Sequence, residues 1–276
     1  MTIAVLSGKG GTGKTMIATS LVRAIEDCQY LDCDVEEPNG FLFLKPYIAD
    51  STPVNVKVPE VRLDRCIGCG DCARNCQFHA LASTGAHILT FPGLCHHCGT
   101  CSLVCHADAI VEVDRRIGWI DSDCDQRFLQ GRLDVGEPVG VPIVAALKKR
   151  IREQGQTILD CAPGSSCGVV RTLEGCDYAL LVAEPTPFGL HDFRMVVELV
   201  KKMGIRPGVV LNKSGLKDGP LEEFCREEGL PILLRIPYLR RIAEWYSAGR
   251  ILTDMGEEWA ARFRNLAHQI EREVVS

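Results

Sequence analysis

The sequence has no apolar run near the length that crosses a bilayer, which is about 20 residues. It also has no excess of positive charge, because 31 Lys and Arg are outnumbered by 36 Asp and Glu and no long basic run is present. Binding to nucleic acid or to an anionic membrane surface depends on basic patches of that kind. We therefore expect neither nucleic acid nor a membrane among its partners.

The amino-terminal residues also lack the pattern of a secretory signal. Their apolar stretch is short and leads directly into the glycines and the lysine of Gly8–Gly11. We therefore expect a cytoplasmic location, where thiols stay reduced.

Cysteine, in contrast, is abundant at 15 residues, which in a chain without a secretory signal favours metal binding over disulfides. A run of four, C-x₂-C-x₂-C-x₃-C, occurs twice with identical spacing. The two runs are Cys66, Cys69, Cys72, Cys76 and Cys95, Cys98, Cys101, Cys105. In bacterial ferredoxins with two [4Fe–4S] clusters, the fourth cysteine of each run binds the other cluster.

This spacing predicts two [4Fe–4S] clusters. One is held by Cys66, Cys69, Cys72 and Cys105, and the other by Cys95, Cys98, Cys101 and Cys76. Structural zinc, the alternative, uses pairs of ligands rather than a repeated run of this length. Gln77 and His106 replace the proline usual after each fourth cysteine, which leaves the ligand sets complete but alters the surroundings of the clusters.

Outside the cysteine-rich segment, short apolar strands alternate with amphipathic helices. We expect strands at 2–6, 29–31, 157–159, 178–183, 208–211 and 232–236, and helices at 16–26, 188–203, 221–228, 239–248 and 257–274. This alternation predicts an α/β fold with a doubly wound, mostly parallel sheet. The last helix mixes acids and bases on its polar face, so we expect it to dock on the core of the protein rather than on a membrane.

The alternation is interrupted by the cysteine-rich segment. We expect a small α+β, bacterial-ferredoxin-like domain at 58–116, inserted between the two parts of the larger domain at 1–57 and 117–276. Residues 49–58, with prolines nearby, are expected to be a linker.

A glycine-rich loop follows the first strand and opens the first helix, and it matches G-x-x-x-x-G-K-S/T. Glycines let backbone N–H groups converge on phosphate oxygens, and the helix adds the positive end of its dipole. We expect Lys14 at the β- and γ-phosphates and Thr15 on Mg²⁺. The expected nucleotide-binding residues of the loop are Gly8, Gly10, Gly11, Thr12, Gly13, Lys14 and Thr15.

Acidic residues follow two other strands, whose carboxyl ends meet at the ligand-binding edge of a parallel sheet. Asp160 precedes Ala162–Gly164 and is predicted to hold Mg²⁺ through water. Asp34 is predicted to orient or deprotonate the attacking water. An aspartate in this place also serves as a helix cap, and for Asp32 that alternative stays open.

The segment from Lys9 to Thr15, K-G-G-T-G-K-T, resembles the deviant Walker A motif of the MinD/ParA-type ATPases, a family that includes the nitrogenase iron protein and metal-cofactor maturation ATPases. The resemblance implies an ATP-sandwich dimer in which Lys9 crosses to the nucleotide of the partner, as an arginine finger does. A solvated loop lysine is the alternative. The catalytic residues would then be Lys9, Lys14 and Asp34.

The same resemblance implies that Asn212 contacts adenine. Gly215 stands where a guanine-specific aspartate would be, so ATP is favoured over GTP. The stretches Asp32–Asn39 and Glu184–Asp192 extend the resemblance over the chain, to MinD-superfamily ATPases with an inserted ferredoxin domain. For Asp192 we expect a helix-capping role, with a contact to nucleotide or partner as the alternative.

The resemblance implies an ATP-hydrolysing, Mg²⁺-dependent iron–sulfur protein that couples dimer changes to cofactor assembly or electron transfer. Its partners would be a second copy or a paralogous ATPase, together with a redox or metal-cofactor protein. The alternative is a MinD/ParA-like positioning ATPase in which the ferredoxin module is a docking or sensing element.

Cys167 follows Asp160 by the offset at which the nitrogenase iron protein carries a cluster-ligating cysteine. We hypothesise that Cys167 faces the dimer interface and binds metal there, with simple packing as the stronger alternative. Cys124 is the only candidate for a second ligand. Most other cysteines outside the two runs are expected to be buried.

Overall fold

The computed structural model describes residues 1–215 and 217–275. Its strands are β1 (Thr2–Leu6), β2 (Cys28–Asp32), β3 (Asp50–Val61), β4 (Leu81–Ser83), β5 (Ile88–Thr90), β6 (Ile110–Ser122), β7 (Phe128–Leu133), β8 (Gln156–Asp160), β9 (Tyr178–Ala183), β10 (Arg206–Ser214) and β11 (Ile232–Pro237). Over these described residues, nine strands form one sheet in the order β11-β10-β9-β1-β8-β2-β7-β6-β3, and β4 pairs with β5 separately. Only β6 runs antiparallel to its neighbours in the large sheet, so the predicted mostly parallel α/β sheet is confirmed.

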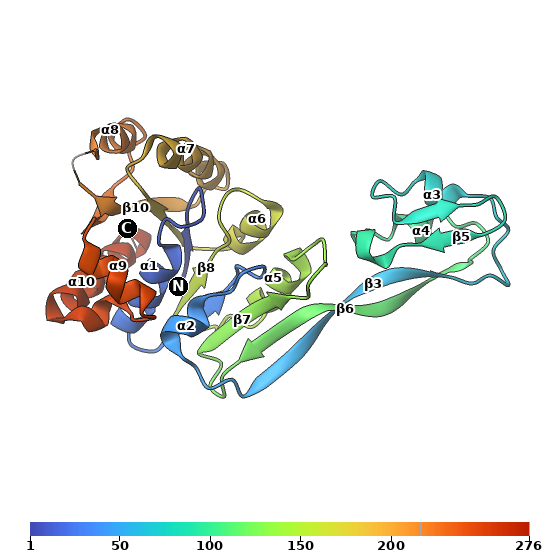
Figure 1. The fold of residues 1–276 in the computed structure, drawn as a ribbon, viewed down its shortest axis with the longest axis horizontal. Helices are drawn as coiled ribbons and strands as arrows, with labels where there is room; N and C mark the ends of the chain where they lie inside the picture. Colours follow the sequence, from blue (N-terminus) through green and yellow to red (C-terminus); the bar gives the residue numbers. More distant parts are fainter. Residues whose placement is uncertain (216, 276) are drawn as a thin grey trace.

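Helices cover both faces of this sheet (Figure 1). They are α1 (Lys14–Ala24), α2 (Gly40–Leu44), α3 (Asp71–Arg74), α4 (Thr100–Leu103), α5 (Val141–Lys148), α6 (Cys167–Leu173), α7 (Pro187–Lys202), α8 (Gly219–Glu227), α9 (Arg240–Ser247) and α10 (Glu257–Val275), with 3₁₀ turns η1 (Pro92–Leu94) and η2 (Leu252–Met255). Helices α1, α9 and α10 pack on one face, and α5 to α8 on the other. None of the described helices is long and apolar enough to span a membrane.

The central strands are apolar on both sides because each face has a core of its own. In β1, Ile3 and Val5 belong to the core under α1 and α10, whereas Ala4 and Leu6 belong to the core under α5 to α8. Such continuous apolar runs are typical of buried parallel strands. The apolar stripe of α10, including Trp259 and Phe263, is buried in the first core, so the prediction that the last helix docks on the protein is confirmed.

The expected linker at 49–58 is wrong, because residues 50–58 belong to β3, which pairs with β6 along its whole length. Strand β3 is an edge strand of the large sheet and has a partner on one side only. Pro53 and Pro59, which lack a backbone N–H, are therefore tolerated there. The expected domain boundaries at 58 and 116 fall inside these two paired strands. We call β3 and β6 the ribbon, and residues 62–109 at its end the module.

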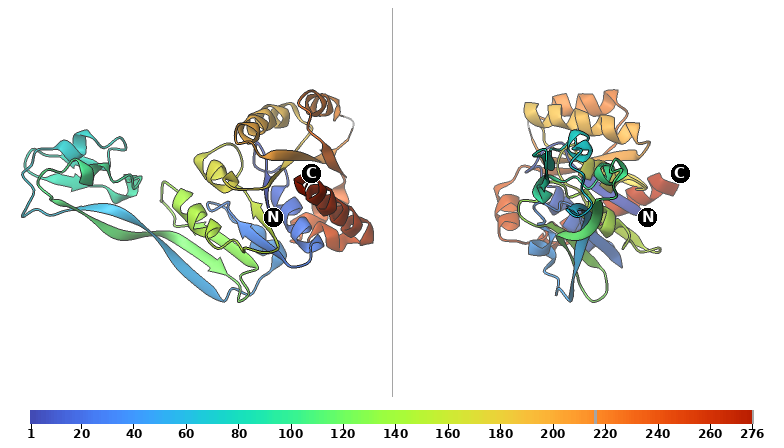
Figure 2. Two further views of the ribbon diagram at one scale, coloured as in Figure 1. Left: turned by 180° about the vertical axis from the view of Figure 1, so that it is seen from behind. Right: turned by 90° about the vertical axis from the view of Figure 1, so that its right-hand side faces the viewer.

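The ribbon carries the module away from the rest of the chain, the main domain (Figures 1 and 2). Strand β3 runs in the same direction as the parallel strands. The register of the sheet, followed from β8 across β2, β7 and β6, places Ser51 of β3 in line with Asp160, the last residue of β8. From Thr52 to Val61 the strand continues for roughly 30 Å at about 3.3 Å per residue. The module therefore lies beyond the carboxyl edge of the sheet. Its ferredoxin-like fold stays a prediction.

Candidate functional site

The glycine-rich loop between β1 and α1 contains positions at which only glycine fits. Gly11 and Gly13 have φ of 75° and 96°, in the left-handed region that other residues avoid. Gly8 has a different role, because a Cβ there would lie 2.3 Å from the backbone carbon of Asp192. The absence of a side chain at Gly8 therefore lets the first turns of α7 pack directly on the loop.

Two residues at the end of β10 hold this loop from the other side. Asn212 is buried, and its Nδ2 donates to the carbonyl oxygen of Thr12 at 2.7 Å. The Nζ of Lys213 donates to the carbonyl oxygen of Gly11 at 3.0 Å. Asn212 therefore lies against the loop in which the nucleotide is expected. Lys213 had no expected role, although its place directly after Asn212 at a strand end was a usable signal.

Asp32 and Asp160 lie side by side at the carboxyl edge, because β2 and β8 pair in register there. The buried hydroxyl of Tyr30 lies 3.0 Å from Asp160 Oδ2 and 3.3 Å from Asp32 Oδ2. Burial raises the pKa of Asp160, and the nearby Lys14 ammonium and the Thr15 and Tyr30 hydroxyls oppose this rise. Asp160 Oδ1 is buried and has no hydrogen-bond partner within the described residues.

That oxygen is the feature of the site that fits a magnesium ion. A buried carboxylate oxygen without a partner is costly, and a hydrated cation beside it supplies the missing donor or charge. Thr15 and Lys14 are next to the same carboxylate, as a Mg²⁺-nucleotide site requires. The residues present therefore fit Mg²⁺ held through Asp160 and Thr15.

Asp32 has a structural role. Its Oδ2 accepts from the backbone N–H groups of Asn39 at 3.0 Å and Gly40 at 2.8 Å, and its Oδ1 accepts from Asp34 N at 3.2 Å. These bonds hold the turn that leads into α2. The geometry therefore favours the capping alternative for Asp32, which accepts from the first backbone N–H groups of α2 although Asn39 is the N-cap residue itself.

Asp34 lies half-buried at the same edge. Burial raises its pKa to about 6, although the Lys14 ammonium works in the opposite direction. A carboxylate with that pKa is an effective proton acceptor near neutral pH. Its placement fits the expected role of orienting or deprotonating water.

Lys9 is held within its own chain. Its Nζ lies 3.8 Å from Glu184 Oε2, and the same carboxylate oxygen accepts from Lys213 Nζ at 3.1 Å. The Lys9 side chain keeps 32% of its exposure, so the pair is only partly shielded from water. Glu184, which follows β9, therefore brings two lysines to the rim of the loop.

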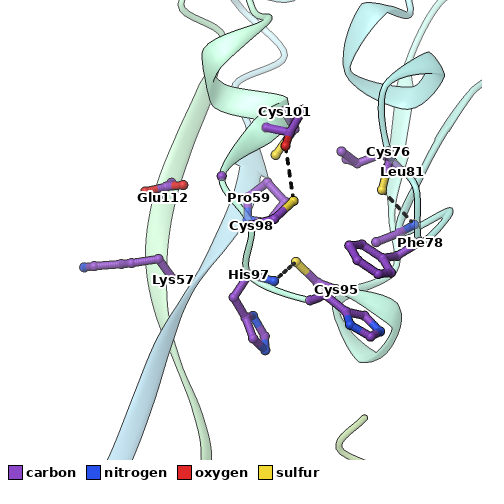
Figure 3. Close-up of a pocket in the computed structure, with 14 residues that line it drawn as sticks. Lys57, Pro59, Cys76, Phe78, Leu81, Cys95, His97, Cys98, Cys101 and Glu112 are labelled. Carbon is purple, nitrogen blue, oxygen red and sulfur yellow. Dashed lines mark hydrogen bonds between the residues drawn. The ribbon is translucent and has the colours of Figure 1, made fainter. Parts of the chain in front are cut away.

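The eight cysteines of the two runs fall into two groups around two separate pockets of the module. One pocket is lined by Cys66, Cys69, Cys72 and Cys105, and the other by Cys76, Cys95, Cys98 and Cys101. In the second pocket the four sulfur atoms point toward a common space (Figure 3). The fourth cysteine of each run thus lines the pocket of the other run.

Backbone N–H groups are directed at several of these sulfurs. Ala80 N lies 3.3 Å from Cys76 Sγ, and Ala109 N lies 3.3 Å from Cys105 Sγ, so the two crossing cysteines have equivalent donors. His97 N donates to Cys95 Sγ at 3.4 Å (Figure 3). Donors of this kind stabilise thiolates, which are the cluster-binding form of cysteine.

Among residues 1–215 and 217–275, no group of three or more His, Cys, Asp or Glu side chains is arranged to hold a single metal ion. A cubane spreads its four cysteine ligands over four irons, so their sulfurs stand farther apart than ligands of one ion. The two groups of four cysteines fit such clusters in ligand type and number. The clusters themselves stay a prediction.

The remaining cysteines are mostly buried, as expected, and Cys124 and Cys167 are the two exposed ones. Cys167 begins α6 at the carboxyl edge. Cys124 lies in the turn between β6 and β7, where the neighbouring Arg127 pairs with Asp27 before β2, at the amino edge. The suggestion of Cys124 as a second ligand beside Cys167 is therefore wrong within one chain.

Thr186, and not Asp192, caps α7. The Thr186 hydroxyl oxygen accepts from Gly189 N at 3.0 Å, whereas Asp192 lies in the second turn, with its backbone against Gly8. His191, beside it, is exposed. The prediction that Asp192 caps this helix is therefore wrong, because Thr186 is the N-cap residue.

We expect Tyr30→Phe to weaken the apparent affinity for Mg²⁺ in ATP hydrolysis by about 10- to 100-fold, as the loss of an outer partner of a metal ligand commonly does. The reason is that the hydroxyl orients Asp160. The check is a Mg²⁺ titration of the hydrolysis rate. Tyr178→Phe is the matched control, because the Tyr178 hydroxyl is buried without a partner among the described residues. Equal titration curves for both variants would contradict this role.

Comparisons with known proteins define the class. Residues 3–252 match the CobQ/CobB/MinD/ParA nucleotide binding domain, and the chain belongs to this family. It is 31% identical over 262 residues to the uncharacterized protein MJ0579 of Methanocaldococcus jannaschii, covering 90% of each chain. It is 33% identical over 226 residues to MJ0578 of the same organism, covering 79% of this chain and 80% of that one.

Solved structures share the fold. The cell division ATPase MinD of Pyrococcus furiosus matches with a TM-score of 0.58 at 22% identity, over 98% of each chain. The septum site-determining protein MinD of Pyrococcus horikoshii, complexed with Mg-ADP, matches with a TM-score of 0.56 at 21% identity, over 98% of this chain and 96% of that one. At these identities the likeness concerns the fold alone.

Proposed function

We propose that this chain is a Mg²⁺-dependent ATPase of the MinD/ParA type, whose ATP-bound dimer acts as a switch and whose module is a docking or sensing element. The observation that carries this proposal is the unpartnered, buried Oδ1 of Asp160 beside Lys14 and Thr15. The similarity to cell-division and septum-site ATPases supports a switch over the assembly or electron-transfer roles that we also expected.

Each residue of the site has a defined part in this proposal. The backbone of the loop and Lys14 bind the phosphates of ATP, while Thr15 and Asp160 hold Mg²⁺, which neutralises charge on those phosphates. Asn212 fixes the loop through the carbonyl oxygen of Thr12 and, in this proposal, contacts adenine. Asp34 accepts the proton of the attacking water or orients it, and Lys9 of each subunit serves the nucleotide of the partner.

The test is dimerisation driven by nucleotide. We expect the wild-type chain with Mg²⁺ and a non-hydrolysable ATP analogue to double in mass in multi-angle light scattering, and Lys14→Ala to stay monomeric because it loses the phosphate contact. Lys202→Ala is the control, since that exposed lysine of α7 pairs only with Glu198 within the described structure. A wild-type chain that neither binds the analogue nor dimerises would contradict the proposal.

A second function is supported by the module itself. Two groups of four cysteines, each around its own pocket, fit two [4Fe–4S] clusters, which would supply one-electron transfer to a redox or metal-cofactor protein. In this form the switch would control electron transfer or cofactor assembly. Both functions share the nucleotide site and differ in whether the module exchanges electrons with the partner.

We expect protein prepared without oxygen to contain about 8 iron and 8 sulfide per chain, as two [4Fe–4S] clusters require. Cys76→Ser is expected to lose about half of this iron, because Cys76 lines only the pocket of Cys95, Cys98 and Cys101. Cys225→Ser, at a buried cysteine of α8 far from the module, is the control. Zinc in place of iron, or full iron in Cys76→Ser, would overturn this assignment.

A further inference from the structure

One arginine joins the module to the main domain. Arg115 lies on β6, and its guanidinium contacts both the module and the main domain. Its Nη1 donates to the carbonyl oxygen of Pro92 in the module at 2.8 Å. Its Nη2 forms an ion pair with Glu137, in the loop between β7 and α5 of the main domain.

The module side of this contact is the segment that leads to a cysteine group. Pro92 begins η1, and its carbonyl oxygen also accepts from Cys95 N at 3.1 Å. Arg115 thus touches the segment that positions the first cysteine of the second run.

On the main domain, the partner of Arg115 is the buried side chain of Glu137. The Glu137 side chain is only 8% exposed, and its second carboxylate oxygen is buried without a partner in the part of the chain that the structure describes. Separating such a pair leaves a buried charge without compensation, which disfavours the departure of Arg115 from Glu137. In Figure 1 the β7–α5 loop reaches from the main domain toward the module beside the ribbon.

The end of β7 and the loop that follows it contact the segment after β2 that carries Asp34. Val35, the next residue, accepts from Leu133 N at 2.8 Å. Its side chain occupies the space beside two glycines, since a Cβ on Gly131 or Gly140 would lie 2.6 or 2.5 Å from a methyl group of Val35. Val35 therefore contacts residues on both sides of the loop that bears Glu137, which is the physical connection between Asp34 and that loop.

We propose that Arg115 is a positioning residue that transmits the nucleotide-dependent state of the Asp34–Val35 segment, through Glu137, to the Pro92–Cys95 segment of the module. This inference rests on the proposed function, because it needs a nucleotide-dependent change at Asp34. It assigns the regulated side of the module: the group of Cys76, Cys95, Cys98 and Cys101 responds to nucleotide, and the group of Cys66, Cys69, Cys72 and Cys105 does not.

The test is hydrogen–deuterium exchange of the full chain, prepared without oxygen, with and without Mg²⁺ and a non-hydrolysable ATP analogue. In the wild type we expect the analogue to slow exchange about threefold or more in three segments, the glycine-rich loop, residues 134–140 and residues 91–98, and to leave residues 66–72 unchanged. Arg115→Ala should lose the response at 91–98 while keeping it at the loop and at 134–140. Arg115→Lys, which keeps the charge, should recover part of it.

Arg116→Ala is the matched control. Arg116 is the next residue of β6 and pairs with Asp134 of the same loop at 2.9 Å, but it lies over Trp119 and has no contact with the module among those that the structure describes. Its response at 91–98 should equal that of the wild type. Glu137→Gln should reproduce Arg115→Ala.

The outcomes separate the two proposals. No slowing at the glycine-rich loop in the wild type would overturn the ATPase proposal and the coupling with it. Slowing at the loop without any change at 91–98, or an unchanged response at 91–98 in Arg115→Ala, would overturn the coupling alone.

Discussion

Lys9→Ala is expected to retain nucleotide binding by the monomer while lowering the turnover number of ATP hydrolysis by about 10³-fold, the lower end of the effect of an arginine finger. The physical reason is that a charge supplied across a dimer interface stabilises the developing negative charge of the transition state without contributing to the site of its own chain. The measurements are steady-state phosphate release and the binding of fluorescent ADP. In the isolated chain the Lys9 ammonium lies beside the Glu184 carboxylate, at 3.8 Å.

The ion pair with Glu184 does not prevent this crossing. Partly exposed pairs contribute about 1 kcal/mol or less, which a bound nucleotide of the partner readily exceeds. Lys202→Ala again serves as the control, because it removes a lysine that pairs with Glu198 on the outer surface of α7. A Lys9→Ala variant that hydrolyses ATP at the wild-type rate would show that Lys9 is a solvated loop residue.

The parts of the molecule that were predictable from sequence are those whose structure is determined by residues close together in the chain. Strands β1 and β9 begin and end where their apolar runs do, and the stripe of α10 is buried as its spacing indicates. The glycine-rich loop and the two cysteine runs are also local, because spacing alone brings most of their ligands together. The fourth cysteine of each run required knowledge of the bacterial arrangement.

The ribbon and β7 were not predicted, for a physical reason. Strand β3 alternates between buried valines and exposed polar residues and contains two prolines, and β6 carries several charged side chains, so neither has the apolar content of a central strand. Their stability comes from pairing with each other across the inserted module. No local pattern in one strand reports a partner about 60 residues away.

The polar contacts between segments that are distant in the sequence could not be predicted either. The hydroxyl of Tyr30 meets Asp160, and Arg115 meets Glu137, only because the sheet and the ribbon bring them together. The cap of α7 shows the same limit at short range: both Thr186 and Asp192 are capping residue types, and only the observed start of the helix at Pro187 decides between them.

Asp34→Asn is expected to bind ATP and dimerise as the wild type does, but to hydrolyse it about 10²- to 10⁴-fold more slowly, the range that general-base catalysis contributes. An amide occupies the same space and cannot accept the proton of water. Quenched-flow measurement of bound ATP and ADP on the dimer checks this, since the variant should hold ATP unhydrolysed. Wild-type hydrolysis in Asp34→Asn would remove Asp34 from the mechanism.

The pH dependence gives an independent test of the same role. Burial raises the pKa of Asp34 to about 6, so the carboxyl is protonated below that pH and ionised above it. Only the ionised form accepts a proton, so the rate should fall as the pH drops through about 6, and the residual rate of Asp34→Asn should not show this step. Glu37 raises the pKa of Asp34 by its like charge, so Glu37→Gln should keep the activity and move the step to lower pH. A step that stays in place in Glu37→Gln and persists in Asp34→Asn would belong to another group.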